Sequence, residues 1–234
     1  MQYYYINLDR RKERNKHFLS EIKKSKIISS RIKRFSAVDG FQLDIKNIPD
    51  NILTAKSKLE LLDKNKTFGI SLTYGAVGCA LSHYELYKKC IDANEDFLIL
   101  EDDVTIDPII DKYLEDYIDY FKYDLLYFGF HRHSHTELKK VHPLINRITG
   151  NIWGTFAYVV TPNFCKYCIE KIFPISIQFD SEISKHINQK KIIAMAFNTN
   201  VIQAKHLGTD IQGGDGMNLI RNVQQDPWQM VFEC

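Results

Sequence analysis

The feature that most constrains this chain is an apolar run at residues 97–100 that ends in three consecutive acids, Glu101, Asp102 and Asp103. An uninterrupted apolar run of this length is typical of a strand that is buried on both faces of a sheet. Such strands belong to α/β proteins, where ligands bind in the crevice outside the carboxyl ends of the strands. The run therefore predicts a central strand whose acids stand at a ligand-binding edge.

The three adjacent acids also predict a cation. Neighbouring carboxylates repel one another strongly unless a positive charge lies among them. Side chains alternate along an extended segment, so Glu101 and Asp103 are expected to point one way and Asp102 the other. A metal ion bound with a nucleotide diphosphate meets this requirement. The alternative is a helix N-terminus, where each acid gains about 0.3–1 kcal/mol from the macrodipole.

Strand and helix signals alternate along the rest of the chain. Aromatic and apolar segments predict strands at 3–8, 32–36, 124–129, 153–161 and 192–196. Helical spacing predicts helices at 10–24, 53–62, 80–93, 108–122 and 181–190, with a small-residue loop at 73–78. This order predicts an α/β fold with a mostly parallel central sheet and helices on both faces.

The length of 234 residues suits a single domain over 1–234. The glycine-rich run at 213–216 predicts a flexible C-terminal segment, 208–234, that is either a lid or a loose end. Lys and Arg total 31 against 29 for Asp and Glu, a balance that gives no electrostatic argument for nucleic acid.

No apolar run approaches the ~20 residues that span a bilayer, and the polar start Met1-Gln2 lacks a signal-peptide pattern. Neither a transmembrane segment nor export is therefore expected. The five cysteines are irregularly spaced, which indicates reduced thiols rather than a disulfide framework. These features predict a cytoplasmic protein.

Several segments occur together in the order of a known family. They are Ile6-Asn7-Leu8-Asp9-Arg10 with Arg14, Ala37-Val38-Asp39-Gly40, Gly78-Cys79-Ala80-Leu81-Ser82-His83, Leu98-Ile99-Leu100-Glu101-Asp102-Asp103-Val104, and Gly154-Thr155 with Ala157-Tyr158. In these segments the chain resembles glycosyltransferase family 25, which includes lipopolysaccharide galactosyltransferases and collagen hydroxylysine galactosyltransferases.

The resemblance implies a GT-A fold, Mn²⁺ or Mg²⁺, and inverting transfer of galactose from UDP-galactose. It implies a glycan, a lipid-linked saccharide or a hydroxylysine-containing protein as acceptor, contacted through the variable stretches 41–66, 129–147 and 208–234. A UDP-glucose-dependent glucosyltransferase and a catalytically silent glycan- or nucleotide-binding domain of the same fold remain alternatives. A metal-dependent phosphoryl-transfer or hydrolytic enzyme is a third, but the chain lacks a G-x-x-x-x-G-K loop.

By the same likeness, Asp103 is expected to bind the metal directly. Glu101 and Asp102 are expected to reach the ribose or a metal-bound water. Glu101 is also a candidate metal ligand beside Asp103. His206, near the end of a late strand, is the candidate for a further ligand. Its alternative is an ordinary structural or surface histidine, and Asp210 is the substitute.

An inverting transfer also needs a carboxylate that takes the proton of the acceptor hydroxyl. The resemblance places Asp180 at the family's late Asp, where it is either this base or a ligand of the sugar hydroxyls. The alternative is an N-cap for the helix that follows. Glu182 is the second candidate for the base.

The nucleotide is expected at the end of the first strand, where Asn7 and Leu8 can meet uracil and ribose. Arg10 or Arg14 is expected to contact phosphate or to brace the loop, because a guanidinium offers paired donors in fixed geometry.

Two further motifs are expected near the nucleotide. Asp39 is expected to anchor its turn and to reach uridine. Ser82 and His83 are expected to begin the helix beside the pocket, one of them touching the nucleotide. The alternative is a helix cap at Ser82 and a buried, hydrogen-bonded His83.

Overall fold

The computed structural model describes residues 1–63, 72–118, 120–132, 134–205, 207 and 210–211. Its strands are β1 (Gln2–Asn7), β2 (Ile32–Ser36), β3 (Phe97–Glu101), β4 (Val104–Ile106), β5 (Leu125–Arg132), β6 (Leu138–His142), β7 (Ile145–Ile148), β8 (Ile152–Val160), β9 (Ala194–Phe197) and β10 (Ile202–Ala204). Its α-helices are α1 (Lys12–Glu21), α2 (Lys26–Arg31), α3 (Ala55–Leu62), α4 (Tyr74–Ala93), α5 (Ile110–Asp116), α6 (Pro162–Lys171) and α7 (Phe179–Asn188), and its 3₁₀ turns are η1 (Ile22–Lys24), η2 (Gly40–Gln42) and η3 (Ile45–Asn47).

The strands in the described residues form an eight-stranded sheet in the order β2-β1-β3-β8-β5-β9-β7-β6, with β4 and β10 paired separately. Neighbouring strands are parallel in β1–β2, β1–β3 and β5–β9 and antiparallel in β3–β8, β5–β8, β7–β9 and β6–β7. The predicted mostly parallel sheet is therefore wrong at the level of pairing, because the sheet is mixed. Since β8 runs against both neighbours, β3 and β5 still point the same way, and β8 begins at the edge where they end.

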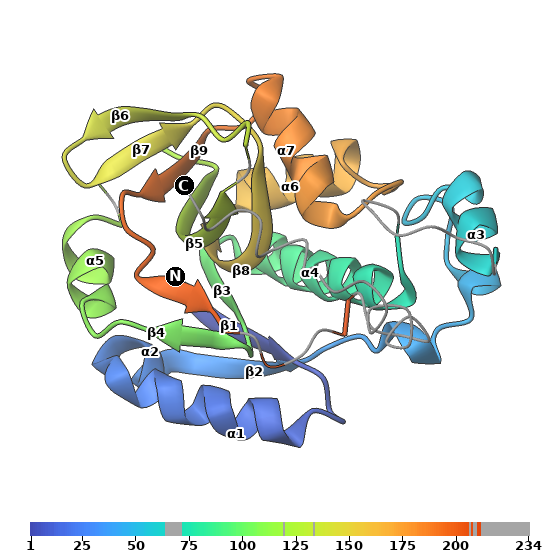
Figure 1. Ribbon diagram of the computed structural model, residues 1–234, viewed down its shortest axis with the longest axis horizontal. Helices are drawn as coiled ribbons and strands as arrows, with labels where there is room; N and C mark the ends of the chain where they lie inside the picture. The colour runs from blue at the N-terminus through green and yellow to red at the C-terminus, as the bar shows by residue number, and fades with distance from the viewer. Residues whose placement is uncertain (64–71, 119, 133, 206, 208–209, 212–234) are drawn as a thin grey trace.

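The central strand β3 is buried on both faces, as the sequence predicts. Its residues 97–100 are at most 1% exposed. Phe97 and Ile99 pack into the core beneath α4, α6 and α7, whereas Leu98 and Leu100 pack into the core beneath α1, α2 and α5. Helices therefore cover both faces of the sheet, which confirms that part of the prediction (Figure 1).

The segment predicted as a small-residue loop at 73–78 is the start of α4. The hydroxyl of Thr73 caps this helix by accepting a hydrogen bond from the amide of Ala76 at 3.0 Å. A Cβ on Gly78 would lie 2.5 Å from the carbonyl oxygen of Val38, so glycine lets the helix touch the turn that precedes η2. The small residues therefore serve close packing within a helix.

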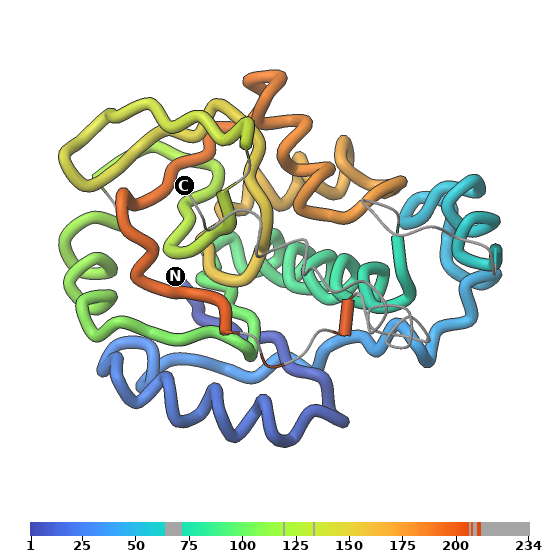
Figure 2. The backbone as a smooth tube through the Cα atoms, viewed as in Figure 1, coloured from blue at the N-terminus to red at the C-terminus, as the bar shows by residue number. Residues whose placement is uncertain are grey.

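A further helix is shorter than predicted, and two stretches predicted to be variable or flexible are described in part. The helix predicted at 108–122 is shorter, with α5 ending at Asp116, and the variable stretch 129–147 contains the end of β5 and the β6–β7 hairpin. Most of the segment expected to be flexible, 208–234, lies outside the described residues. Its residues 210–211, drawn in orange-red between grey stretches, lie against the first turn of α4, where Thr73 donates a hydrogen bond to the carbonyl of Ile211 (Figure 2). Among the described helices, none has the length and apolar character needed to cross a bilayer.

Candidate active site

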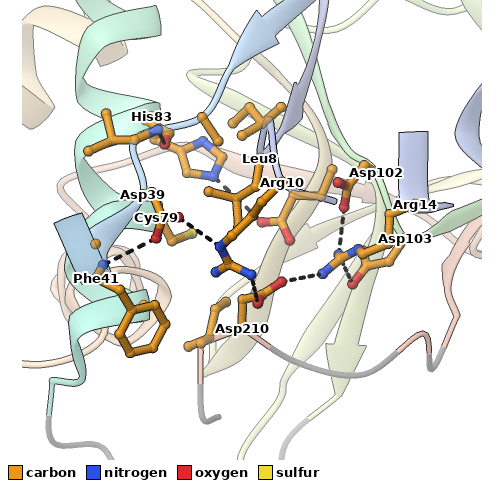
Figure 3. A pocket seen from close by; sticks show the side chains of 18 residues that line it. Leu8, Arg10, Arg14, Asp39, Phe41, Cys79, His83, Asp102, Asp103 and Asp210 are labelled. Carbon is orange, nitrogen blue, oxygen red and sulfur yellow. Dashed lines mark hydrogen bonds and ion pairs between the residues drawn. The ribbon is translucent and has the colours of Figure 1, made fainter. Parts of the chain in front are cut away.

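A pocket opens where β1 and β3 end, bordered by η2, the first turns of α4 and residues 210–211. The fold brings these predicted residues together in its lining: Leu8, Arg10, Arg14, Asp39, Ser82, His83, Glu101, Asp102 and Asp103. Cys79 and Asp210 also line it (Figure 3). Asn7, Asp180 and Glu182 are not among the lining residues, and His206 lies outside the described residues.

The cation among the acids is the guanidinium of Arg14. Its Nη2 lies 2.6 Å from a carboxylate oxygen of Asp102 and 2.6 Å from one of Asp103, and its Nη1 lies 3.3 Å from Asp210. The predicted alternation is wrong, because the chain turns after Glu101 and both aspartates reach the same guanidinium (Figure 3). Arg14 extends from α1 with only 9% of its side chain exposed, so its ion pairs are weakly screened.

Asp103 is only partly neutralised. Its Oδ2 pairs with Arg14, but its Oδ1 is buried and has no hydrogen-bond partner. Burial and the nearby charge of Glu101 raise the pKa of Asp103 to about 7. Burial also raises the pKa of Asp102, which Arg14 and Asn7 partly oppose. An unpaired carboxylate oxygen in this setting fits a divalent cation that prefers oxygen ligands.

Glu101 faces His83 of α4, whereas Asp102 and Asp103 pair with Arg14. Its Oε1 lies 3.6 Å from Nε2 of His83 and accepts a hydrogen bond from the hydroxyl of Thr155 at 3.4 Å. Burial would raise the pKa of Glu101, but the neighbouring His83 ring and Arg14 outweigh it and hold that pKa below its ordinary value. The carboxylate therefore favours its charged form.

His83 is completely buried, and its other ring nitrogen is held in place. Nδ1 lies 2.7 Å from the hydroxyl of Tyr158, which lies 2.7 Å from the hydroxyl of Tyr87. This matches the buried, hydrogen-bonded alternative, although His83 also lines the pocket. Cys79 lies one helical turn earlier on α4, and burial together with the charges of Glu101, Asp180 and Asp103 raises the pKa of its thiol.

Three arginines converge on Asp210. Arg10 donates to it at 2.8 Å, Arg11 donates through two nitrogens at 2.8 Å each, and Arg14 donates at 3.3 Å. Burial would raise the pKa of Asp210, but the hydrogen bonds from Arg11 and Arg10 outweigh it and hold that pKa below its ordinary value. The carboxylate therefore occupies a cluster of donors that suits an anion such as phosphate.

Asp39 and Ser82 shape the wall opposite the acids. Asp39 accepts hydrogen bonds from the amide of Phe41 at 3.2 Å and from Arg10 at 2.7 Å, so it anchors its turn as expected. Ser82 does not begin a helix, because α4 starts at Tyr74. Its hydroxyl donates to the carbonyl of Gly78 and accepts from the amide of Val38 at 2.9 Å, which ties α4 to the turn.

Asn7 is 2% exposed and fully engaged beneath the pocket. Its amide donates to Asp102 at 2.5 Å and to the carbonyl of Arg11 at 3.2 Å, while its oxygen accepts from Arg34 at 2.9 Å. These bonds position Asp102 and the start of α1. Ile6 and Leu8, on either side of Asn7, line the pocket at the end of β1.

Asp180 and Glu182 lie in the first turn of α7, and their contacts differ. Asp180 accepts hydrogen bonds from the amide of Gly154 at 2.9 Å and of Ser181 at 2.7 Å. Burial raises its pKa, and the charge of Glu101 adds to that rise. Glu182 is instead buried against the segment before the helix, where its Oε1 accepts from the amides of Ser176 and Ile177 and from the Ser176 hydroxyl.

Sequence reasoning gave no role to Cys79, which lines the pocket, or to Arg11, which binds the lining residue Asp210. The signal for Cys79 was its spacing of four residues from His83, which places both on one face of a helix. Arg11 gave no such signal, because its contact with Asp210 joins residues 199 positions apart.

A family model and several known proteins match this chain, and they indicate the same family. Residues 1–183 match the family model described as "Glycosyltransferase family 25 (LPS biosynthesis protein)". The chain is 28% identical over 198 residues to a "Glycosyltransferase 25 family member" of Anopheles gambiae, covering 80% of this chain and 32% of that protein. It is 29% identical over 167 residues to "Procollagen galactosyltransferase 2" of Homo sapiens, covering 67% of this chain and 25% of that protein.

A bacterial relative is also similar. The chain is 30% identical over 113 residues to "Lipooligosaccharide biosynthesis protein lex-1" of Haemophilus influenzae, covering 42% of this chain and 37% of that protein. The alignments therefore span only about a third of the mosquito protein and a quarter of the human one.

Proposed function

This chain belongs to glycosyltransferase family 25, and we propose that it is a metal-dependent, inverting galactosyltransferase of the GT-A type. The proposed donor is UDP-galactose, and the proposed acceptor is a hydroxyl of a glycan, of a lipid-linked saccharide or of a hydroxylysine-containing protein. The names of the human and bacterial relatives support galactose transfer and saccharide or collagen-type acceptors.

The observation that carries this proposal is the unpaired, buried Oδ1 of Asp103 within a cluster of acids. Asp103 would hold a divalent cation, with Glu101 beside it and His206 as a proposed further ligand. Bound there, Mn²⁺ or Mg²⁺ would neutralise the charge that develops on the departing diphosphate. Asp102 is held by Asn7 and Arg14, and in this proposal it would bind the ribose or a metal-bound water.

The arginines supply the second part of the argument. Arg10 and Arg14 present guanidinium donors to the same pocket, where they can bind the donor's phosphates in place of the Asp210 carboxylate. Leu8 offers an apolar contact to uracil, and Asp39 lies at the same wall for the uridine hydroxyls. In this proposal Leu8 and Asp39 would bind the uridine, and Arg10 and Arg14 would bind the diphosphate.

Asp180 is the proposed base that takes the proton from the attacking hydroxyl. Burial raises its pKa, which makes the carboxylate a stronger proton acceptor than an exposed one. Its hydrogen bonds to Gly154 and Ser181 fix the carboxylate between β8 and α7, so that it stays oriented as the acceptor arrives.

The function is tested by incubating the purified protein with UDP-galactose, UDP-glucose and UDP-N-acetylglucosamine, each with Mn²⁺ or with a chelator, and measuring released UDP. We expect UDP release that depends on Mn²⁺ and is fastest with UDP-galactose. Asp103→Asn should remove the Mn²⁺ stimulation, while Glu115→Gln, a change outside the pocket lining, should retain it. Absence of UDP release with every donor and saccharide acceptor would overturn the proposal, and preference for UDP-glucose would replace galactose by glucose.

A further inference from the structure

Three side chains of different chemistry meet on the α4 side of the pocket. Cys79 and His83 are four residues apart on α4, so they lie on the same face of that helix. Glu101 reaches them from the end of β3. One ligand atom from each, the thiol sulfur, a ring nitrogen and a carboxylate oxygen, lies within 4.8 Å of the other two. This separation lets small side-chain rotations bring all three atoms onto a single ion.

The buried imidazole nitrogen of His83 is an independent observation. His83 is 0% exposed, and its Nε2 has no hydrogen-bond partner. Oε1 of Glu101 is 3.6 Å away, which is within ion-pair range but too far for a hydrogen bond. Leaving a buried polar atom unpaired costs about 1–3 kcal/mol, so such an atom in a pocket wall indicates a partner.

The surroundings of His83 resemble those of an oriented metal ligand. Its Nδ1 lies 2.7 Å from the hydroxyl of Tyr158, which is fixed in turn by Tyr87. A hydrogen bond at the far nitrogen sets the tautomer and the ring orientation of a ligating histidine. Glu101 is similarly supported by the hydroxyl of Thr155.

We propose that Cys79, His83 and Glu101 bind a borderline-soft divalent cation such as Zn²⁺. A thiolate, an imidazole and a carboxylate form a ligand set typical of zinc, whereas Mn²⁺ and Mg²⁺ prefer oxygen ligands. On binding, the S–H bond of Cys79 breaks, the sulfur bonds to the ion and the proton leaves to solvent. Three protein ligands would leave a fourth position for a water or another ligand, and all three residues line the pocket.

This site is separate in chemistry from the oxygen-ligand site proposed at Asp103, although both use the neighbourhood of Glu101. An ion on Cys79 and His83 would stand in the wall of the donor pocket and would draw Glu101 toward α4. Zn²⁺ would therefore inhibit any reaction in this pocket. The binding itself does not rest on the proposed sugar transfer.

The test is a titration of the full chain with Co²⁺, whose thiolate complexes give a near-ultraviolet charge-transfer band and whose tetrahedral complexes absorb in the visible range. We expect one equivalent of Co²⁺ to produce both signals and Zn²⁺ to abolish them by displacement. Cys79→Ala should remove the charge-transfer band. Cys90→Ala, which removes a buried thiol from the same helix, and Asp103→Asn should both retain it.

A second measurement keeps the test independent of how the variants fold. In the wild-type chain, Zn²⁺ should slow alkylation of Cys79 by at least tenfold, read by peptide mass spectrometry. A charge-transfer band that persists in folded Cys79→Ala, or an alkylation rate of Cys79 that Zn²⁺ leaves unchanged, would overturn the proposal. Loss of UDP-sugar turnover in Asp103→Asn with the cobalt spectrum intact would separate this site from the catalytic one.

Discussion

Asp103 shows how a single residue can be placed for chemistry at a cost to stability. Its carboxyl group is buried beside Glu101, and only one of its oxygens is paired. Active-site residues commonly oppose stability in this way, because the charge that catalysis needs is unfavourable in the free protein. This arrangement makes the pH dependence of folding a test of the site.

The ordinary pKa of Asp103 is 3.8 and its folded pKa is about 7. Between these values the folded protein keeps a proton that the unfolded chain has lost, so the free energy of unfolding falls as pH rises. We expect Asp103→Asn, in chelator, to be more stable than wild type at pH 8 by about 1–2 kcal/mol, since one pKa unit is worth about 1.4 kcal/mol. Urea unfolding at pH 4, close to the ordinary pKa, should give nearly equal stabilities. Parallel stability curves from pH 5 to 8 would contradict the assignment.

Asp180 is expected to matter for transfer and not for donor binding. Asp180→Asn removes the proton acceptor but keeps the size of the side chain, so UDP binding should persist while transfer falls by ~10² or more. UDP affinity by calorimetry and transfer by product analysis separate the two effects. Glu182→Gln is the control, because Glu182 mainly accepts hydrogen bonds from residues 176–177 and should affect stability alone. The reverse outcome would make Glu182 the base.

At the scale of elements, α4 joins the two sides of the pocket through close packing. Intrinsic propensity predicts that replacing a helical glycine by alanine stabilises a helix by about 1 kcal/mol. Gly78→Ala should do the opposite here and destabilise the protein by about 1–3 kcal/mol, because the new Cβ would lie 2.5 Å from the Val38 carbonyl. Urea unfolding measures the sign directly. Lys89→Ala, an exposed position on the same helix, should change stability by less than about 0.5 kcal/mol.

Elements with a strong local signal were predictable from sequence. The strand β1 follows from aromatic and β-branched residues, the buried strand β3 follows from its apolar run, and the main length of α4 follows from its helical spacing. The first turn of α4 was missed because Tyr-Gly-Ala-Val-Gly contains weak helix formers. The Thr73 cap that starts it was visible in the sequence, whereas the packing against Val38 that favours it was not.

At the scale of the whole molecule, long-range pairing was beyond sequence reasoning. Periodicity predicts that 153–161 is a strand, but it does not say that β8 runs antiparallel between β3 and β5. The acids were predictable as a cluster because they are consecutive. Their counter-charge was not, since Arg14 reaches Asp102 and Asp103 only when α1 packs beside the end of β3.

Asp210 binds three arginines from the start of the chain, Arg10, Arg11 and Arg14. We expect the donor's phosphates to compete with Asp210 for these arginines. If the donor's phosphates use the same arginines, Asp210→Asn should free Arg10 and Arg11 and tighten UDP binding about fivefold to tenfold, or about 1–1.4 kcal/mol. Calorimetry with Mn²⁺ present measures this change. Arg11→Gln tests the opposite side and should weaken UDP binding. Weaker binding in Asp210→Asn would instead favour a role for Asp210 at the metal.

The ion pairs of Arg14 have a consequence for the stability of the metal-free protein. Its positive charge is built into the chain, so Asp102 and one oxygen of Asp103 are paired in the folded protein before any ion arrives. Removal of the proposed metal with a chelator should therefore stop transfer while the protein stays folded.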